Sequence, residues 1–194
     1  MSVYDEIGIR RVLNASGSMT YLGGLLIHPD VVEKMASAAR SFVVMEELMA
    51  WAGGEIARIT GTEAGLVTTG TSGGILLSTA AALTRGDRAR VRALPQTDGP
   101  DRIVVQRTHL VGWEFGIRVA GATLVPVGGD QGATREELAA AIGPDTAAVF
   151  YVELAPTPSL PLADVAQVAH EKGVPVIVDA AAELPPVSNL NAFY

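Results

Sequence analysis

From residue 64 onward, short apolar segments alternate with longer segments in which apolar residues recur at helical spacing. This alternation is typical of βαβ units, in which a mostly parallel sheet is buried between helices. We therefore predict an α/β fold of three layers, with a mostly parallel sheet and helices on both faces. The expected strands span residues 64–69, 102–106, 122–127, 146–152 and 174–179. The expected helices between them span residues 72–84, 111–120, 134–142 and 162–172.

The segment before this alternation has a different pattern. Residues 1–29 are polar, rich in glycine and weakly periodic, which predicts an extended arm with turns. Helices are expected over residues 30–40, where Asp30 is a plausible N-cap, and over residues 45–60. Within the alternating part, residues 85–101 are charged and contain Pro and Gly, so we expect a loop there.

Length and composition restrict the classes of protein that fit. The chain has 194 residues, enough for one well-cored domain, and we expect an arm over 1–29 followed by one domain over 30–194. Its net charge of -7 argues against nucleic acid or an anionic membrane as a partner, because both require a basic face. The sequence has no cysteine, which excludes disulfides and thiolate chemistry. No secretory signal or membrane span is visible, so a cytoplasmic location is expected.

A small, polar turn follows the first expected strand and opens a helix. In it, Gly70 precedes Thr71 and Ser72, whose hydroxyl groups can donate hydrogen bonds. Free backbone N–H groups and the helix dipole make such a junction an anion site, and small residues let a phosphate approach. A tight turn capped by the serine explains this segment equally well. The pattern is neither a Walker loop nor G-x-G-x-x-G.

Two further candidates follow the ends of other expected strands. His109 could stack on a flat cofactor, act as a base, or be an ordinary loop histidine. Asp179 could pair with a pyridinium nitrogen or a metal, or could cap the next turn. Glu153 and Glu183 lie near the same edge, but no ligand spacing supports a metal site. A phosphate site, a stacking histidine and an aspartate together suit pyridoxal phosphate (PLP).

The sequence also resembles a known family over nearly its whole length. It is similar to the fold-type-I PLP enzymes of the selenocysteine-synthase-like group, in the branch that includes D-glucosaminate-6-phosphate ammonia-lyase. Residues 92–99 resemble an insertion that is typical of that branch. The other stretches that carry the resemblance are residues 11–24, 57–74, 104–114 and 174–190.

The resemblance implies a role for each candidate residue. Gly70, Thr71 and Ser72 would hold the phosphate of PLP. His109 would stack on the ring, and Asp179 would pair with the ring nitrogen and keep it protonated. The N-terminal arm would approach the substrate, across a subunit interface, through Asn14, Ser16 and Thr20.

The resemblance further implies a homo-oligomeric, dimeric lyase that acts on a polar amino acid or an amino-sugar acid. Its reaction would be Cα deprotonation and β-elimination, assisted by a Schiff-base lysine. In this group that lysine lies further along the chain than Asp179, whereas the only lysines here are Lys34 and Lys172 on expected helices. We therefore expect a truncated, incomplete PLP-binding large domain that binds PLP weakly or not at all and is inactive alone.

Three other functions remain open at this stage. The same missing lysine fits a non-catalytic interaction or oligomerisation domain derived from this fold. A PLP enzyme that transfers selenium is a further alternative. A Rossmann-type nucleotide binder would share the architecture, but the sequence lacks its glycine fingerprint.

Overall fold

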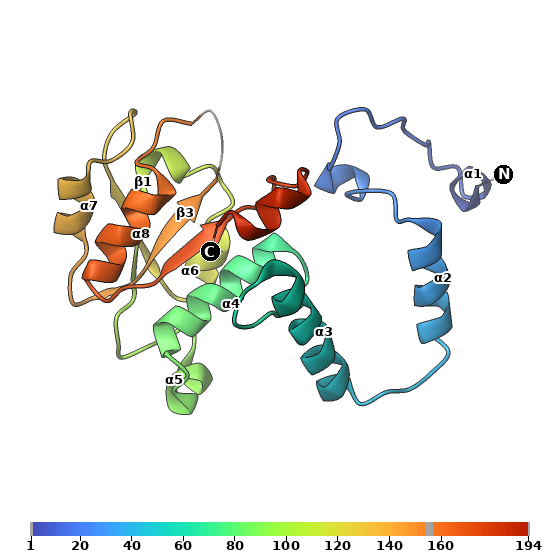
Figure 1. Cartoon of the computed structure of the whole chain (residues 1–194), viewed down its shortest axis with the longest axis horizontal. Helices are drawn as coiled ribbons and strands as arrows, with labels where there is room; N and C mark the ends of the chain where they lie inside the picture. The colour runs from blue at the N-terminus through green and yellow to red at the C-terminus, as the bar shows by residue number, and fades with distance from the viewer. Residues whose placement is uncertain (1, 154–156, 194) are drawn as a thin grey trace. The chain divides into compact units, whose positions relative to one another are not determined.

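The computed structural model describes residues 2–153 and 157–193. The chain divides into two compact units, 1–50 and 51–194, which are coloured along the chain in Figure 1. The expected division into an arm, 1–29, and a domain, 30–194, stays a prediction.

The second unit is built on a four-stranded, all-parallel sheet. Its strands are β1 (Arg102–Gln106), β2 (Thr123–Val127), β3 (Thr146–Val152) and β4 (Val176–Asp179). They are ordered β2-β1-β3-β4, so β1 and β3 are the central strands. Every residue of β3 is buried, as expected of a central strand of a parallel sheet. Four of the five expected strands and their parallel arrangement are thus confirmed.

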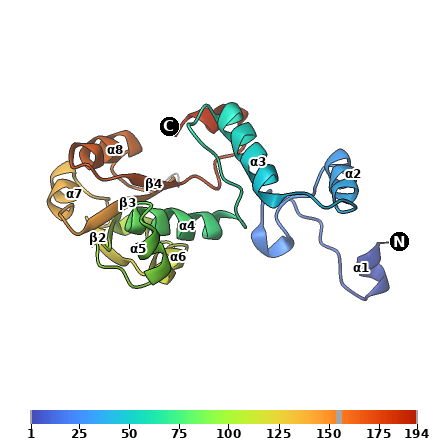
Figure 2. The ribbon, with the colours of Figure 1, turned by 90° about the horizontal axis from the view of Figure 1, so that it is seen from below.

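Helices cover both faces of this sheet. In Figure 2, α4 (Thr71–Thr84) and α6 (Phe115–Val119) lie on one side, and α7 (Arg135–Ala141) and α8 (Leu162–Glu171) lie on the other. The strands turn alternate side chains toward the two helical layers. The three-layer α/β prediction is confirmed. The α4 and α6 face packs Ile75, Leu83 and Ile117 on Ile103, Val105 and Phe150, and the other face packs Leu138, Val165 and Val168 on Val104, Val149 and Tyr151.

Local sequence signals explain where the two helices on the second face begin. Thr134 caps α7 by accepting a hydrogen bond from the Glu137 N–H, and the Glu137 carboxylate accepts one from the Thr134 N–H. This reciprocal pair is a capping box, as the sequence predicts. Pro161 precedes α8, which ends just before Gly173 at a left-handed φ of 70°.

The prediction of a first strand over residues 64–69 is wrong. This segment pairs with no strand among the described residues, and the side chains of Leu66 and Val67 are 62% and 48% exposed. An apolar run becomes a strand only where a neighbouring strand accepts its backbone hydrogen bonds. The segment therefore enters α4 as an irregular stretch.

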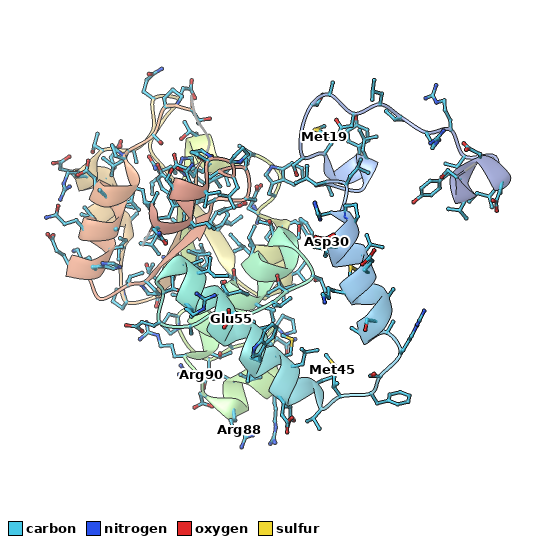
Figure 3. All side chains as sticks on the ribbon, turned by 45° about the vertical axis from the view of Figure 1, so that its right-hand side comes forward. Met19, Asp30, Met45, Glu55, Arg88 and Arg90 are labelled. Atoms are coloured by element: carbon cyan, nitrogen blue, oxygen red, sulfur yellow. The ribbon has the colours of Figure 1, made fainter. Side chains whose placement is uncertain are left out.

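The expected loop over residues 85–101 contains a short helix, α5 (Arg88–Ala93), so that prediction is wrong there. Asp87 caps this helix by accepting hydrogen bonds from the N–H groups of Ala89 and Arg90. The Arg90 side chain, labelled in Figure 3, then pairs with Asp98 at 3.1 Å. An aspartate cap and an ion pair thus order a segment whose charge suggested a loop.

The helix expected over residues 111–120 begins later than predicted, at Phe115. Gly112 has a φ of 95° and donates its N–H to the Glu114 carboxylate. This turn separates α6 from the short 3-10 helix η2 (Arg107–His109) that follows β1. Another 3-10 helix, η3 (Val187–Asn191), lies near the C-terminus, where the sequence predicts no further strand.

The first unit contains helices but no core. Its elements are α1 (Val3–Glu6), the 3-10 helix η1 (Thr20–Leu22), α2 (Pro29–Ala38) and the start of α3 (Met45–Thr60). The α1 helix, with a Ser2 capping box, corrects the expectation of an extended arm. No residue between 2 and 50 is buried.

The predicted cap of α2 is also wrong. His28 occupies the N-cap position, and its Nδ1 atom accepts the Asp30 N–H at 3.3 Å. Pro29 follows at the first helical position, where its missing N–H costs nothing, so Asp30 falls within the first turn. None of the described helices is long and apolar enough to cross a bilayer.

Candidate functional site

The start of α4 offers unpaired backbone donors. Gly70 is the N-cap residue, and its carbonyl accepts the Gly74 N–H at 2.9 Å as the first helical bond. No described residue accepts a hydrogen bond from the N–H groups of Thr71, Ser72 or Gly73. Three N–H groups at the positive end of a helix form an anion site.

The start of this helix has free space beside it, and its N-cap position requires glycine. Gly70 has a φ of 107° and a ψ of 179°, a conformation that is accessible almost only to glycine. A Cβ at this position would meet no atom within 4 Å, so space is free beside the N–H groups. The side chains of Thr71 and Ser72 are exposed, and no side chain caps the helix. The alternative of a serine-capped turn is therefore wrong, and the donor set fits a phosphate.

His109 lies in η2, directly after β1, and is only 1% exposed. Its Nδ1 atom accepts the N–H of Val152, the last residue of β3, at 3.3 Å. Its ring meets that of Tyr151 edge-on, with 4.5 Å between the ring centroids and an interplanar angle of 83°. Burial lowers the pKa of His109 from 6.5 to about 4, so the imidazole is neutral near pH 7. A ligand that stacks on this ring must replace a neighbour that covers it.

Asp179 ends β4 beside the same residue of β3. Val152 and Asp179 are register partners in the parallel pair of strands, and the Glu153 N–H donates to the Asp179 carbonyl at 2.9 Å. One carboxylate oxygen of Asp179 accepts the Ala181 N–H at 3.1 Å, so the turn-cap interpretation is confirmed. The other carboxylate oxygen has no partner among the described residues. Asp179 is 8% exposed and retains one free acceptor.

Contacts bring the helix start close to the segment that contains His109. A Cβ on Gly116, in the first turn of α6, would lie 3.3 Å from the Ser72 carbonyl oxygen. The starts of α4 and α6 are therefore packed together. The chain runs from η2 into α6, and His109 is hydrogen-bonded to Val152 beside Asp179. Helix packing, the chain connection and this hydrogen bond therefore link the phosphate donors to the histidine and the aspartate.

Two acidic residues lie near Asp179. Burial raises the pKa of Glu153, and the nearby Glu183 carboxylate raises it further. The described residues contain no group of three potential metal ligands. The two carboxylates therefore make this part of the edge acidic.

Three residues that the sequence analysis missed support this region: Gln106, Tyr151 and Ser159. Gln106 is buried at the end of β1 and hydrogen-bonds two loops. Tyr151 contacts His109 and lies 3.5 Å from the Ser159 hydroxyl. The only signal of Gln106 and Tyr151 in the sequence is a polar atom on an otherwise apolar strand, since buried polar groups require partners. Ser159 lies outside the strands and gives no such signal.

The predicted substrate-binding residues lie in the first unit. Asn14 donates to the Gly17 carbonyl at 2.6 Å and accepts the Ser16 N–H at 2.9 Å, which closes a local turn. Thr20 begins η1. These side chains shape the arm locally, and their substrate role stays a prediction.

Known proteins are similar to this chain in sequence and in fold. D-glucosaminate-6-phosphate ammonia lyase of Salmonella typhimurium (strain 14028s / SGSC 2262) is 38% identical over 190 residues, which cover 94% of this chain and 52% of the relative. A 5'-C-glycyluridine monooxygenase-decarboxylase of a Streptomyces species is 34% identical over 93% of this chain and 48% of the relative. The chain spans about half the length of the curated relatives it matches.

A solved structure of D-glucosaminate-6-phosphate ammonia-lyase superposes on the whole chain with a TM-score of 0.93 and 37% identity. The chain covers 53% of that structure. The family model of the DegT/DnrJ/EryC1/StrS aminotransferases matches residues 57–186. That range includes the α4 start, His109 and Asp179. The family and the ammonia-lyase relative imply PLP as the cofactor, as the sequence predicts. The chain belongs to the DegT/DnrJ/EryC1/StrS aminotransferase family.

Proposed function

We propose that this chain forms the phosphate-binding and ring-binding side of a PLP-dependent lyase. The substrate would be a polar amino acid or an amino-sugar acid phosphate, and the reaction Cα deprotonation followed by β-elimination. The observation that supports this most directly is the glycine-specific start of α4, with three unpaired N–H groups and open space beside them. The 38% identity to an ammonia lyase supports the reaction class.

Each candidate residue has a defined task in this proposal. The N–H groups and hydroxyls of Thr71 and Ser72 bind the phosphate, while Gly70 leaves room for it. Asp179 offers its free carboxylate oxygen to the ring nitrogen and holds a proton there. When bound, PLP supplies an electron sink for the pair released at the substrate Cα. His109 is the ring-stacking residue, and burial keeps it neutral, so it adds no positive charge beside the ring.

The sequence has two lysines, Lys34 and Lys172. Lys172 follows α8 and precedes β4, whereas Asp179 lies at the other end of β4. The extended stretch from residue 174 to residue 179, which lies between the two, alone spans about 17 Å. Lys34 lies on α2, in the first unit. We expect these 194 residues to bind PLP without a covalent bond to Lys172, because it lies at the far end of β4, and we propose the same for Lys34.

A titration of the 194-residue chain with PLP tests this proposal. We expect weak but saturable binding by PLP fluorescence, competition by inorganic phosphate, and loss of binding in Gly70→Ala. Borohydride treatment followed by peptide mass spectrometry should find no PLP attached to Lys34 or Lys172. Binding that is unchanged in Gly70→Ala, or a reduced adduct on either lysine, would contradict the proposed arrangement. Absence of PLP binding would favour a non-catalytic interaction domain.

The reaction class needs its own test, because a second relative is named for a monooxygenase-decarboxylase. We expect amino-sugar acid phosphates, rather than nucleoside-linked amino acids, to perturb the spectrum of the PLP-bound chain. The opposite preference would favour chemistry like that of the second relative. The membership of the selenocysteine-synthase-like group, the dimer and the cytoplasmic location remain parts of the proposal. Sedimentation and cell fractionation test the last two.

A further inference from the structure

Gln106 is the last residue of β1, and its side chain is fully buried with every polar atom bonded to the backbone. Its Oε1 atom accepts the N–H of Ala133 at 3.1 Å and the N–H of Leu160 at 2.7 Å. Its Nε2 atom donates to the Leu160 carbonyl at 3.2 Å. These bonds join the end of a central strand to two loops that are 27 and 54 residues away in the sequence.

Gln106 thereby holds Ala133, which lies shortly before α7, and Leu160, which lies shortly before α8. The two segments also touch each other, because a Cβ on Gly132 would lie 2.7 Å from the Ser159 Cα atom. This close approach leaves little freedom for Ser159, which lies next to Leu160 in the sequence. The Gln106 side chain therefore fixes the position of the Ser159 backbone from one side, and Gly132 from the other.

Ser159 leads back to the candidate site through one aromatic residue. Its hydroxyl lies 3.5 Å from the Tyr151 hydroxyl, and the Tyr151 ring meets His109 edge-on at 4.5 Å. His109 itself lies three residues after Gln106. Gln106 is therefore linked to His109 in two ways. One is the short stretch of chain between them, and the other runs through Leu160, Ser159 and Tyr151.

We propose that Gln106 is a positioning residue of the cofactor site: by binding the backbone at Ala133 and Leu160 it holds Ser159 against Tyr151 and so fixes the His109 ring. This inference rests on the proposed function, since it assigns His109 to the site that binds PLP. A purely structural role would give Gln106 an effect on stability alone. A positioning role gives it an effect on the environment of His109 in the folded protein.

The test compares Gln106→Met, which keeps the length of the side chain and removes all three hydrogen bonds, with Val149→Ala. Val149 is buried on β3 in the same core layer, and its truncation destabilises the protein without touching the Gln106 hydrogen bonds. In the full 194-residue chain, NMR titration of the His109 imidazole should give a pKa of about 4 for the unaltered protein. Gln106→Met should raise it by about one unit or more, because a freed ring is partly rehydrated. Val149→Ala should leave it unchanged.

The same variants are then titrated with PLP, and we expect weaker binding in Gln106→Met than in Val149→Ala. An unchanged His109 pKa in Gln106→Met, or an equal rise in Val149→Ala, would overturn the positioning role. If Gln106→Met does not fold, Ser159→Ala replaces it, and a His109 pKa equal to that of the unaltered protein would then overturn the role. Failure of the unaltered chain to bind PLP would reject the proposed function. The titration of His109 would still show whether Gln106 positions the histidine ring.

Discussion

The Nδ1 atom of His109 accepts a hydrogen bond from the backbone N–H of Val152 at 3.3 Å. Since Nδ1 is an acceptor, the neutral ring carries its proton on Nε2. Val152 is also the register partner of Asp179, so a single residue at the end of β3 is shared by both ring-binding candidates. The relative placement of histidine and aspartate is thereby fixed by the backbone of the sheet rather than by a flexible loop.

The burial of the His109 ring predicts a specific dependence of stability on pH. The folded-state pKa of His109 is about 4, below the 6.5 of the exposed side chain. The unfolded chain therefore binds the proton first as pH falls, so the stabilising contribution is complete above pH 6.5 and is lost as pH falls to about 4. The full difference is about 3 kcal/mol. Urea unfolding of the protein and of His109→Gln at pH 7 and pH 4.5 measures it.

In His109→Gln the free energy of unfolding should fall less between these two pH values than in the unaltered protein, because glutamine does not titrate. The comparison between the two proteins removes the contribution of the carboxylates. An identical decrease in both proteins would show that the ring is hydrated in the folded state.

The start of α4 gives a second prediction. Gly70→Ala should lower the free energy of unfolding by about 1–3 kcal/mol, because alanine cannot adopt a φ of 107° with an extended ψ without strain. Gly74→Ala is the matched control, since its Cβ would meet only the Thr68 hydroxyl oxygen at 3.8 Å. It should stabilise the helix by up to about 1 kcal/mol. Chemical denaturation of both variants checks the difference, and equal effects would argue against the special backbone at Gly70.

Adjacent glycines in α3 give a third prediction. A Cβ on Gly53 would clash with the Gly65 carbonyl oxygen, whereas a Cβ on Gly54 would meet no atom within 4 Å. Gly53→Ala should therefore destabilise the protein by about 1–3 kcal/mol through overpacking against backbone. Gly54→Ala should stabilise it by about 0.5–1 kcal/mol, because alanine favours a helix. Thermal unfolding of the two variants tests this contact, and similar melting temperatures would contradict it.

The sequence predicts the fold well where local pattern and packing agree. Thr134 and Glu137 form the expected capping box, and the four strands that pair with one another lie where the apolar segments indicate. The pattern fails at residues 64–69, because strand formation depends on a neighbour and not on apolar composition alone. It also fails at α5, where the Asp87 cap and the Arg90–Asp98 ion pair order a charged segment.

The candidate site is only partly readable from the sequence. The phosphate donors could be predicted because they lie in a small, polar turn that opens a helix. His109 and Asp179 could be predicted because they lie at the ends of expected strands. Gln106 and Ser159 do not, because their importance comes from contacts across 54 and 8 residues of sequence, to Leu160 and Tyr151. A polar residue on a buried strand is expected to have hydrogen-bond partners, but the sequence does not identify them.

The first unit leads to a fourth prediction, on association. None of its residues from 2 to 50 is buried, and Leu13, Leu26 and Phe42 are almost completely exposed, at 95%, 101% and 108%. Exposed apolar surface of this kind favours association with other chains. Light scattering of the 194-residue chain should therefore give a mass that rises with concentration above 20.1 kDa. Replacing these three residues by serine should lower it.

A matched control places the same number of serine substitutions in the second unit, at the exposed residues Val91, Val119 and Val187. These side chains lie on or beside short helices of a unit that has its own core, so their replacement should leave the association nearly unchanged. Equal reductions in the two triple variants would show that association is not specific to the first unit. A constant mass of 20.1 kDa at all concentrations would show that the exposed residues do not drive association at all.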